Sequence, residues 1–119
     1  MAMMRSNFID HELAILEPSG YITAANAASF QQELTQAIIS SKHSTFLIDM
    51  HSVGFLDSAG LMALVYVYSL AESLGKRFSV CSLEPSVRII FELTQLDKAL
   101  DIFENRRQFE LLMPNTVAA

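Results

Sequence analysis

The chain has 119 residues, of which 51% are hydrophobic and 18% charged, and this composition is typical of one compact domain rather than of a disordered segment. The formal net charge is −5 and no basic run is present, which argues against nucleic acid and membrane surfaces as partners. Cys81 is the only cysteine, so no internal disulfide can form. We expect Cys81 to be a small core residue in a reducing compartment, and the protein to be cytoplasmic.

Short apolar runs predict four or five strands. Residues 45–50 show little alternation, which is typical of a strand covered on both faces. The turn residues Pro18, Ser19 and Gly20 predict an interruption between two short strand pieces. The predicted strands are 13–16 with 21–22, 45–50, 53–57, 78–81 and 100–103, with a weaker edge strand near 8–9.

About four helices are expected between these strands. Thr23 and Asn26 are both candidates for the N-cap of the first helix, and Gly75 is placed to end the second. Strands alternating with helices predict an α/β fold with a mostly parallel sheet and an antiparallel element at the N-terminal edge. We expect one domain over residues 1–119, with its core at about 8–113 and a frayed tail at 114–119. The first helix is marked by an apolar face of Ala27, Phe30, Leu34, Ala37 and Ile38, and the second, at 58–74, by Leu61 and Leu64. The third follows Pro85 and is marked by Val87, Ile90, Phe91 and Thr94. A short last helix is expected at 106–113.

The segment 55–61, Phe-Leu-Asp-Ser-Ala-Gly-Leu, is where a strand is expected to run into a helix. Free N–H groups at a helix start carry partial positive charge and accept anions, so a phosphate on Ser58 is compatible with the fold. Ser58 equally suits the plain role of an N-cap, and Asp57 also suits a helix N-terminus. Gly60 lies in the first helical turn, where its missing side chain is interpreted as room for a partner.

The second helix is apolar on almost every side, although only one side can pack on the sheet. The spacing leaves Met62, Tyr66 and Ser69 away from the sheet. An exposed apolar surface beside a modifiable hydroxyl indicates a protein partner. The alternative is that neighbouring helices cover this face. The residues expected to face the sheet are Leu61, Leu64, Val65 and Tyr68.

An enzyme is the disfavoured interpretation. The context of Ser58 lacks the first glycine of a G-x-S-x-G elbow, and His11, His43 and His51 have no recognisable spacing from it. No cluster has metal-ligand spacing and no glycine-rich phosphate loop is present. We therefore expect no catalytic residues, no cofactor and no metal.

The chain resembles the STAS domain family, and within it the stand-alone bacterial anti-sigma-factor antagonists. The specific part is Phe-Leu-Ile-Asp at 46–49, then 55–61, then Leu64, and the resemblance extends from about Leu13 to Phe109. Weaker matches are the turn at Gly20 and the dipeptide Glu-Pro at 84–85. The resemblance implies a single STAS-like domain.

It also implies a mechanism. Members bind an anti-sigma factor that is itself a serine kinase of the histidine-kinase-like ATPase fold, and this frees a sigma factor. The kinase then uses ATP to phosphorylate the serine that matches Ser58, which breaks the complex, and a PP2C-type phosphatase removes the phosphate. The partner-binding residues expected on this basis and from the exposed helix face are Thr23, Phe55, Asp57, Gly60, Met62 and Tyr66.

Two positions depart from the family pattern. Thr23 stands where many antagonists carry an acidic residue, and Gln95 stands where a glycine is common. The family also includes domains that act as scaffolds, as regulators of transporters or as subunits of larger complexes, without phosphorylation. A constitutive interaction module is therefore the alternative function, and the apolar helix face also suits a homodimer.

Overall fold

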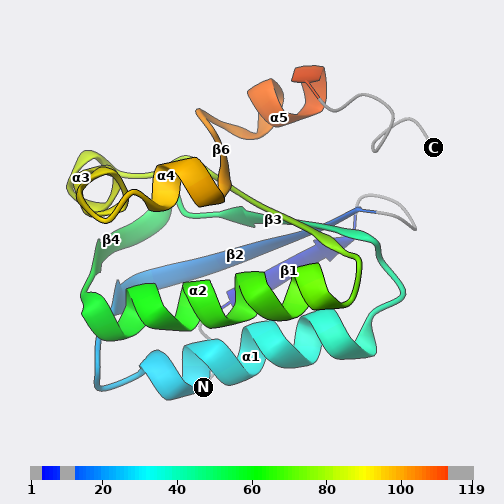
Figure 1. Ribbon diagram of the computed structural model, residues 1–119, viewed down its shortest axis with the longest axis horizontal. Coiled ribbons are helices and arrows are strands. Elements are labelled where there is room, and N and C mark those ends of the chain that lie inside the picture. Colours follow the sequence, from blue (N-terminus) through cyan, green and yellow to red (C-terminus); the bar gives the residue numbers. More distant parts are fainter. Residues whose placement is uncertain (1–3, 9–12, 113–119) are drawn as a thin grey trace.

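The computed structural model describes residues 4–8 and 13–112, which form a mixed α/β fold (Figure 1). The predicted fold class is confirmed, with six strands and five helices in the described part of the chain. The additional helix is α4, which the sequence did not predict. The strands are β1 (Met4–Phe8), β2 (Leu13–Ile22), β3 (Thr45–Asp49), β4 (Ser52–Leu56), β5 (Arg77–Cys81) and β6 (Asp101–Phe103). The helices are α1 (Ala27–Ser40), α2 (Ser58–Ser73), α3 (Pro85–Leu93), α4 (Leu96–Ala99) and α5 (Arg106–Leu112).

The sheet is parallel except at its N-terminal edge. Its order is β1-β2-β3-β5-β6, with β4 paired to β2, and only β1 runs antiparallel. The predicted antiparallel edge is therefore confirmed, although β1 begins earlier than expected. Because the parallel strands β2 and β4 end at the same edge, the turn before α1 and the start of α2 lie side by side there (Figure 1).

The predicted break between residues 16 and 21 is wrong, because β2 is one continuous strand of ten residues. Pro18 is buried within the strand and Gly20 has a φ of +88°, next to a register shift between Gly20 and Tyr21. The register skips Gly54, so the bulge lies in β4, and the turn residues of β2 sit within a continuous strand. As a result, β2 pairs with β3 along its first half and with β4 along its second half.

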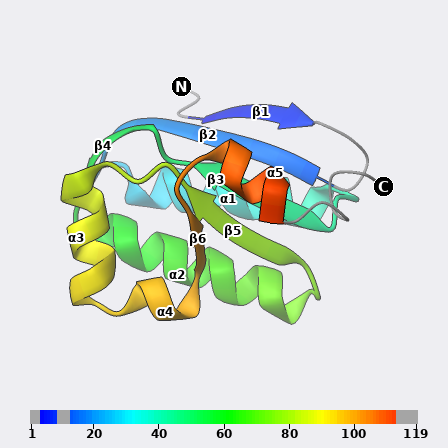
Figure 2. The same ribbon diagram turned by 90° about the horizontal axis from the view of Figure 1, so that it is seen from above.

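Each face of the sheet has its own core. The larger one lies under α1 and α2, which run side by side on one face, and the smaller one lies under α5 on the other face (Figures 1 and 2). Cys81 is buried in the smaller core as expected, and burial raises the pKa of its thiol to about 12. The smaller core consists of Leu13, Ile15, Leu47, Cys81, Phe103 and Phe109.

The predicted end of α2 is confirmed. Leu74 is its C-cap, and Gly75 follows with a φ of +72°. The tail at 114–119 lies outside the described residues. Within residues 13–112, no helix has both the length and the hydropathy that crossing a bilayer requires.

Candidate functional site

Ser58 is the first residue of α2, and its side chain is exposed. Within the described part of the chain its hydroxyl makes no hydrogen bond. The role of N-cap, which the sequence allowed for Ser58, belongs to Asp57 instead. The hydroxyl is therefore not engaged in holding the helix, and it is presented to solvent at the helix start.

Asp57 holds the start of α2 with both carboxylate oxygens. Oδ1 accepts from the N–H of Gly60 and Oδ2 from the N–H of Ala24, each at 3.0 Å. The Asp57 N–H donates to the carbonyl of Ile22 at 3.1 Å. Hydrogen bonds from the backbone, first that of Gly60 and then that of Ala24, lower the pKa of the Asp57 carboxyl, since they favour its ionised form.

The interpretation of Gly60 as room for a partner is wrong. Gly60 is buried, and a Cβ at this position would lie 2.8 Å from the carbonyl oxygen of Ile22 and 2.9 Å from its Cγ2. The missing side chain lets the first turn of α2 pack directly on the end of β2. Gly60 thus allows the start of α2 to lie close to β2, and it offers no surface for a partner to contact.

The turn between β2 and α1 is tied together by Asn26. Its Oδ1 accepts from the N–H of Thr23 at 2.9 Å, and its Nδ2 donates to the carbonyl of Tyr21 at 2.8 Å. Asn26 is the N-cap of α1, yet its side chain makes no capping bond to that helix. Thr23 is half-buried in this turn, and its Oγ1 accepts from the N–H of Ala25 at 3.3 Å.

Large apolar side chains are exposed on the elements that carry Ser58. Met62 and Tyr66 are 63% and 50% exposed, and the spacing of four residues places them on the same side of α2 as Ser58. This confirms the predicted exposed face, while Val65 and Tyr68, expected to face the sheet, are only half-buried. Phe55 at the end of β4 is 42% exposed.

Tyr21 is a site residue that the sequence interpretation missed. It is 68% exposed, and its ring meets that of Phe55 edge to face at 6.2 Å between centroids. The two residues are partners in the parallel pairing of β2 and β4, a register that depends on the unpaired Gly54 of β4. An aromatic residue next to a strand glycine was the available signal. We name the set Tyr21, Thr23, Phe55, Ser58, Met62 and Tyr66 the docking surface.

No cationic side chain lies on the elements that build the docking surface. β2, α1, β4 and α2 contain no Lys or Arg, and the whole run 43–75 lacks both. The nearest charge in sequence is the carboxylate of Asp57. A negative group added to Ser58 would therefore meet backbone N–H groups but no cation from these elements.

Comparison with known proteins identifies the family. The family model of the STAS domain matches residues 7–109. The chain belongs to the STAS domain family. This is a family of binding domains, in agreement with the prediction that the chain is not an enzyme.

Several relatives of this STAS domain share the fold at low identity. An anti-sigma F factor antagonist from Paenibacillus polymyxa is 23% identical over 91 residues, which cover 76% of this chain and 78% of the relative. A STAS domain protein from Planctomyces limnophilus superposes with a TM-score of 0.80 at 18% identity, covering 95% of this chain and 98% of that one. SpoIIAA of Bacillus in its phosphorylated form gives a TM-score of 0.69 at 14% identity, covering 92% and 98%.

A second group of charges lies away from the docking surface of this STAS domain, where Asp49 ends β3. Arg106 of α5 donates to Asp49 at 2.7 Å through Nε and contacts Glu17 at 2.6 Å. His51 Nδ1 lies 2.9 Å from Asp49. Burial disfavours the ionised carboxyl of Asp49, but the bonds from Arg106 and His51 outweigh it and lower its pKa. We name Glu17, Asp49, His51 and Arg106 the charge cluster.

The charge cluster brings together three residue types that can bind metals. Ligand atoms of Glu17, Asp49 and His51 lie within 4.8 Å of one another, a grouping that the sequence did not predict. However, the guanidinium of Arg106 already binds both carboxylates. The cluster is thus arranged as an ion-pair network that holds α5 on the sheet.

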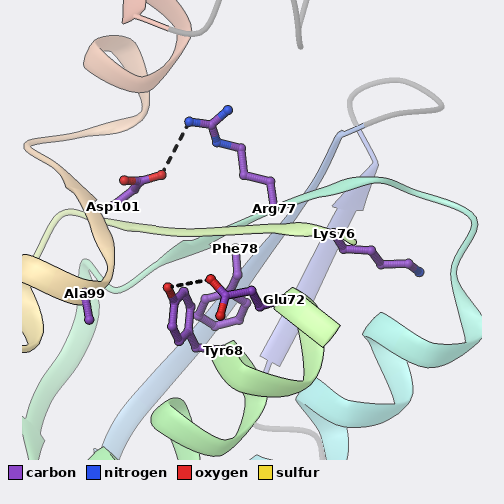
Figure 3. A pocket seen from close by; sticks show the side chains of 7 residues that line it. All are labelled: Tyr68, Glu72, Lys76, Arg77, Phe78, Ala99 and Asp101. Atoms are coloured by element: carbon purple, nitrogen blue, oxygen red, sulfur yellow. Dashed lines mark hydrogen bonds and ion pairs between the residues drawn. The ribbon is translucent and has the colours of Figure 1, made fainter. Parts of the chain in front are cut away.

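A pocket of about 210 Å³ lies at the other end of α2 from Ser58 (Figure 3). Its polar groups are paired with one another. The Tyr68 hydroxyl donates to Glu72 at 3.1 Å, which raises the pKa of Tyr68, and Arg77 contacts Asp101 at 3.4 Å. Lys76 Nζ donates to two carbonyls at the end of α1. The pocket lining is Tyr68, Glu72, Lys76, Arg77, Phe78, Ala99 and Asp101.

Proposed function

We propose that this protein is an anti-sigma-factor antagonist whose binding is switched by phosphorylation of Ser58. The observation that carries the proposal is the free, exposed hydroxyl of Ser58 at the first residue of α2, in line with Met62 and Tyr66. The similarity to an anti-sigma F factor antagonist supports the same function.

The partner in this proposal is an anti-sigma serine kinase of the histidine-kinase-like ATPase fold, met in the cytoplasm. Its apolar groups would pack on the side chains of Tyr21, Phe55, Met62 and Tyr66, with Thr23 and Asp57 at the margin. A PP2C-type phosphatase would restore the binding form. Related SpoIIAA has been solved in a phosphorylated form, which supports a fold that accepts this modification.

The electrostatics favour loss of binding without loss of fold. A phosphate at the start of α2 gains about 0.3–1 kcal/mol from the helix dipole, so the helix should persist. The same group forced against an apolar or acidic partner surface is left unpaired by β2, α1, β4 and α2, because these elements supply no Lys or Arg. Since about 1.4 kcal/mol is a tenfold change in affinity, a modest penalty is enough to release the partner.

The test compares retention of an ATPase-fold kinase from native lysate by wild type, Ser58→Asp and Ser44→Asp. Ser44 is exposed before β3, at the opposite edge of the sheet, so the control variant adds the same charge away from the docking surface. We expect wild type and Ser44→Asp to retain the kinase and Ser58→Asp to lose it, with native circular dichroism in all three. The retained kinase with ATP should then phosphorylate wild type but not Ser58→Ala.

The outcome that would overturn the switch is equal retention by wild type and Ser58→Asp. If the common partner is then not a kinase, the protein is a constitutive interaction module. If the retained partner is a second copy of this chain, the apolar face of α2 is a homodimer interface. Size-exclusion chromatography with light scattering distinguishes these two results.

A further inference from the structure

The carboxylate of Asp57 joins two segments that are far apart in the sequence. One oxygen binds Gly60 inside α2, and the other binds Ala24 in the turn between β2 and α1. Within residues 13–112, the bond to Ala24 is the one hydrogen bond between the turn 23–26 and residues 57–73, which are α2 and its N-cap. The Asp57 N–H separately binds the carbonyl of Ile22, the residue before the turn, so the carboxylate supplies the link to the turn itself.

Hydrogen bonds join the residues of the turn to one another. Asn26 binds the N–H of Thr23 and the carbonyl of Tyr21, and Thr23 in turn accepts from Ala25. These bonds close the turn on itself and include the backbone of the exposed Tyr21. Because Tyr21 is held in β2 by its pairing with Phe55, displacement of Ala24 from Asp57 would shift Thr23 relative to the residues of the docking surface on α2.

We propose that Asp57 is a positioning residue that holds the turn and the start of α2 as one docking surface, and that phosphate on Ser58 weakens its bond to Ala24. This deepens the proposed function and rests on it. A phosphate on Ser58 places a second anion next to the Asp57 carboxylate. No Lys or Arg on β2, α1, β4 or α2 neutralises either negative charge. Both anions then compete for the N–H groups at the helix start.

Of the two hydrogen bonds that the Asp57 carboxylate accepts, we expect the one from Ala24 to weaken first. The bond to Gly60 closes a turn within one helix, whereas the bond to Ala24 spans 33 residues and lies at an exposed backbone position. Phosphorylation would thus act twice, by placing charge in the interface and by loosening the turn that carries Thr23.

The test is amide NMR of the isolated protein in three forms: unmodified, with phosphoserine genetically encoded at position 58, and Asp57→Asn. Asparagine caps helices as well as aspartate does, but its single carbonyl oxygen cannot serve both N–H groups in this geometry. We expect the Ala24 amide resonance to move, and its hydrogen exchange to accelerate about tenfold, in the phosphoserine form and in Asp57→Asn. The Gly60 amide should stay protected in Asp57→Asn. An Ala24 amide that does not respond to phosphoserine would overturn the proposal.

Kinase binding provides the second arm. Asp57→Asn should bind the kinase at least about tenfold more weakly with an unchanged melting temperature, while Asp97→Asn, which removes the same charge from α4, should bind as wild type does. Undiminished binding by Asp57→Asn would count against positioning. The NMR arm needs no partner, so an Ala24 response without any kinase binding would refute the proposed function alone.

Discussion

Two aspartates lie at the ends of strands that follow one another in the chain, and their carboxylates are held in different ways. Asp49 ends β3, is buried, and is bound by the side chains of Arg106 and His51. Asp57 follows β4, is partly exposed, and is bound by backbone N–H groups alone. The pKa of each carboxyl is lowered, mainly by side-chain hydrogen bonds at Asp49 and by backbone hydrogen bonds at Asp57.

The difference separates a structural region from the one for which we propose a switch. In the charge cluster, the guanidinium of Arg106 pairs with both carboxylates and fixes α5 on the sheet, so further change there should reduce stability. At the docking surface, backbone dipoles hold one carboxylate and no cation is committed. We therefore expect the fold to tolerate a new negative charge on Ser58. Within a complex, the partner rather than β2, α1, β4 or α2 would have to supply a cation to pair with that charge.

The largest effect is expected from Arg106→Ala, which leaves Asp49 and Glu17 as close, partly buried anions. We expect a loss of about 2–3 kcal/mol in the free energy of unfolding, below the ~3–5 kcal/mol of a fully buried pair because Arg106 is partly exposed. Urea denaturation measures this loss. Arg107→Ala, at the exposed neighbouring position in α5, is the control and should change stability by less than about 0.5 kcal/mol. Equal effects of the two variants would contradict the comparison.

Acid should act on the same cluster through Asp49. A carboxyl whose pKa is lowered by folding stabilises the protein above its ordinary pKa of 3.8, and this contribution is lost as the pH falls through the lower folded value. Wild type should therefore lose stability below about pH 4. Asp49→Asn should be less stable than wild type at neutral pH, with a gap that narrows in acid. Chemical denaturation between neutral and acid pH measures this gap, and a constant gap would argue against the lowered pKa.

Gly60→Ala should be the most damaging change near the docking surface. The added Cβ would lie 2.8 Å from the carbonyl oxygen of Ile22, so the first turn of α2 must move away from β2. Overpacking costs about 1–3 kcal/mol, and the better helix propensity of alanine recovers less than ~1 kcal/mol of this. Thermal unfolding should show the loss, while Ser69→Ala in the exposed part of α2 should be neutral. A stabilised Gly60→Ala would refute the close contact with β2.

The smallest effect is expected from Ser58→Ala. Because Asp57 is the N-cap, removal of the Ser58 hydroxyl should change the free energy of unfolding by less than about 0.5 kcal/mol. Asp57→Ala, in contrast, should lower the melting temperature clearly. Calorimetry of both variants makes the comparison, and a larger loss for Ser58→Ala would return the capping role to Ser58.

The elements were predictable wherever the local pattern and the tertiary environment agree. The apolar run 45–50 gave β3, and Gly75 marked the end of α2. The outward face of α2 followed from helical spacing, which placed Met62 and Tyr66 in solvent.

The predictions fail where contacts between residues distant in the sequence determine the structure. Pro18 and Gly20 have the chemistry of a turn, but pairing with β1, β3 and β4 keeps β2 extended through them. Gly60 was interpreted from its own helix, whereas its role is set by Ile22, 38 positions earlier in the chain. The link from Asp57 to Ala24 and the approach of Arg106 to Asp49 depend in the same way on strand order, which spacing along the chain does not encode.

The absence of Lys and Arg around Ser58 has a practical consequence for detecting its modification. Trypsin cleaves after Lys and Arg, so complete digestion leaves Ser58 inside the single peptide 43–76, which contains the whole apolar helix α2. Such a peptide is poorly recovered in routine phosphoproteomics, and an empty tryptic data set would say nothing about phosphorylation. Chymotrypsin, which cleaves after Phe55 and Tyr66, confines Ser58 to a short fragment suited to mass spectrometry.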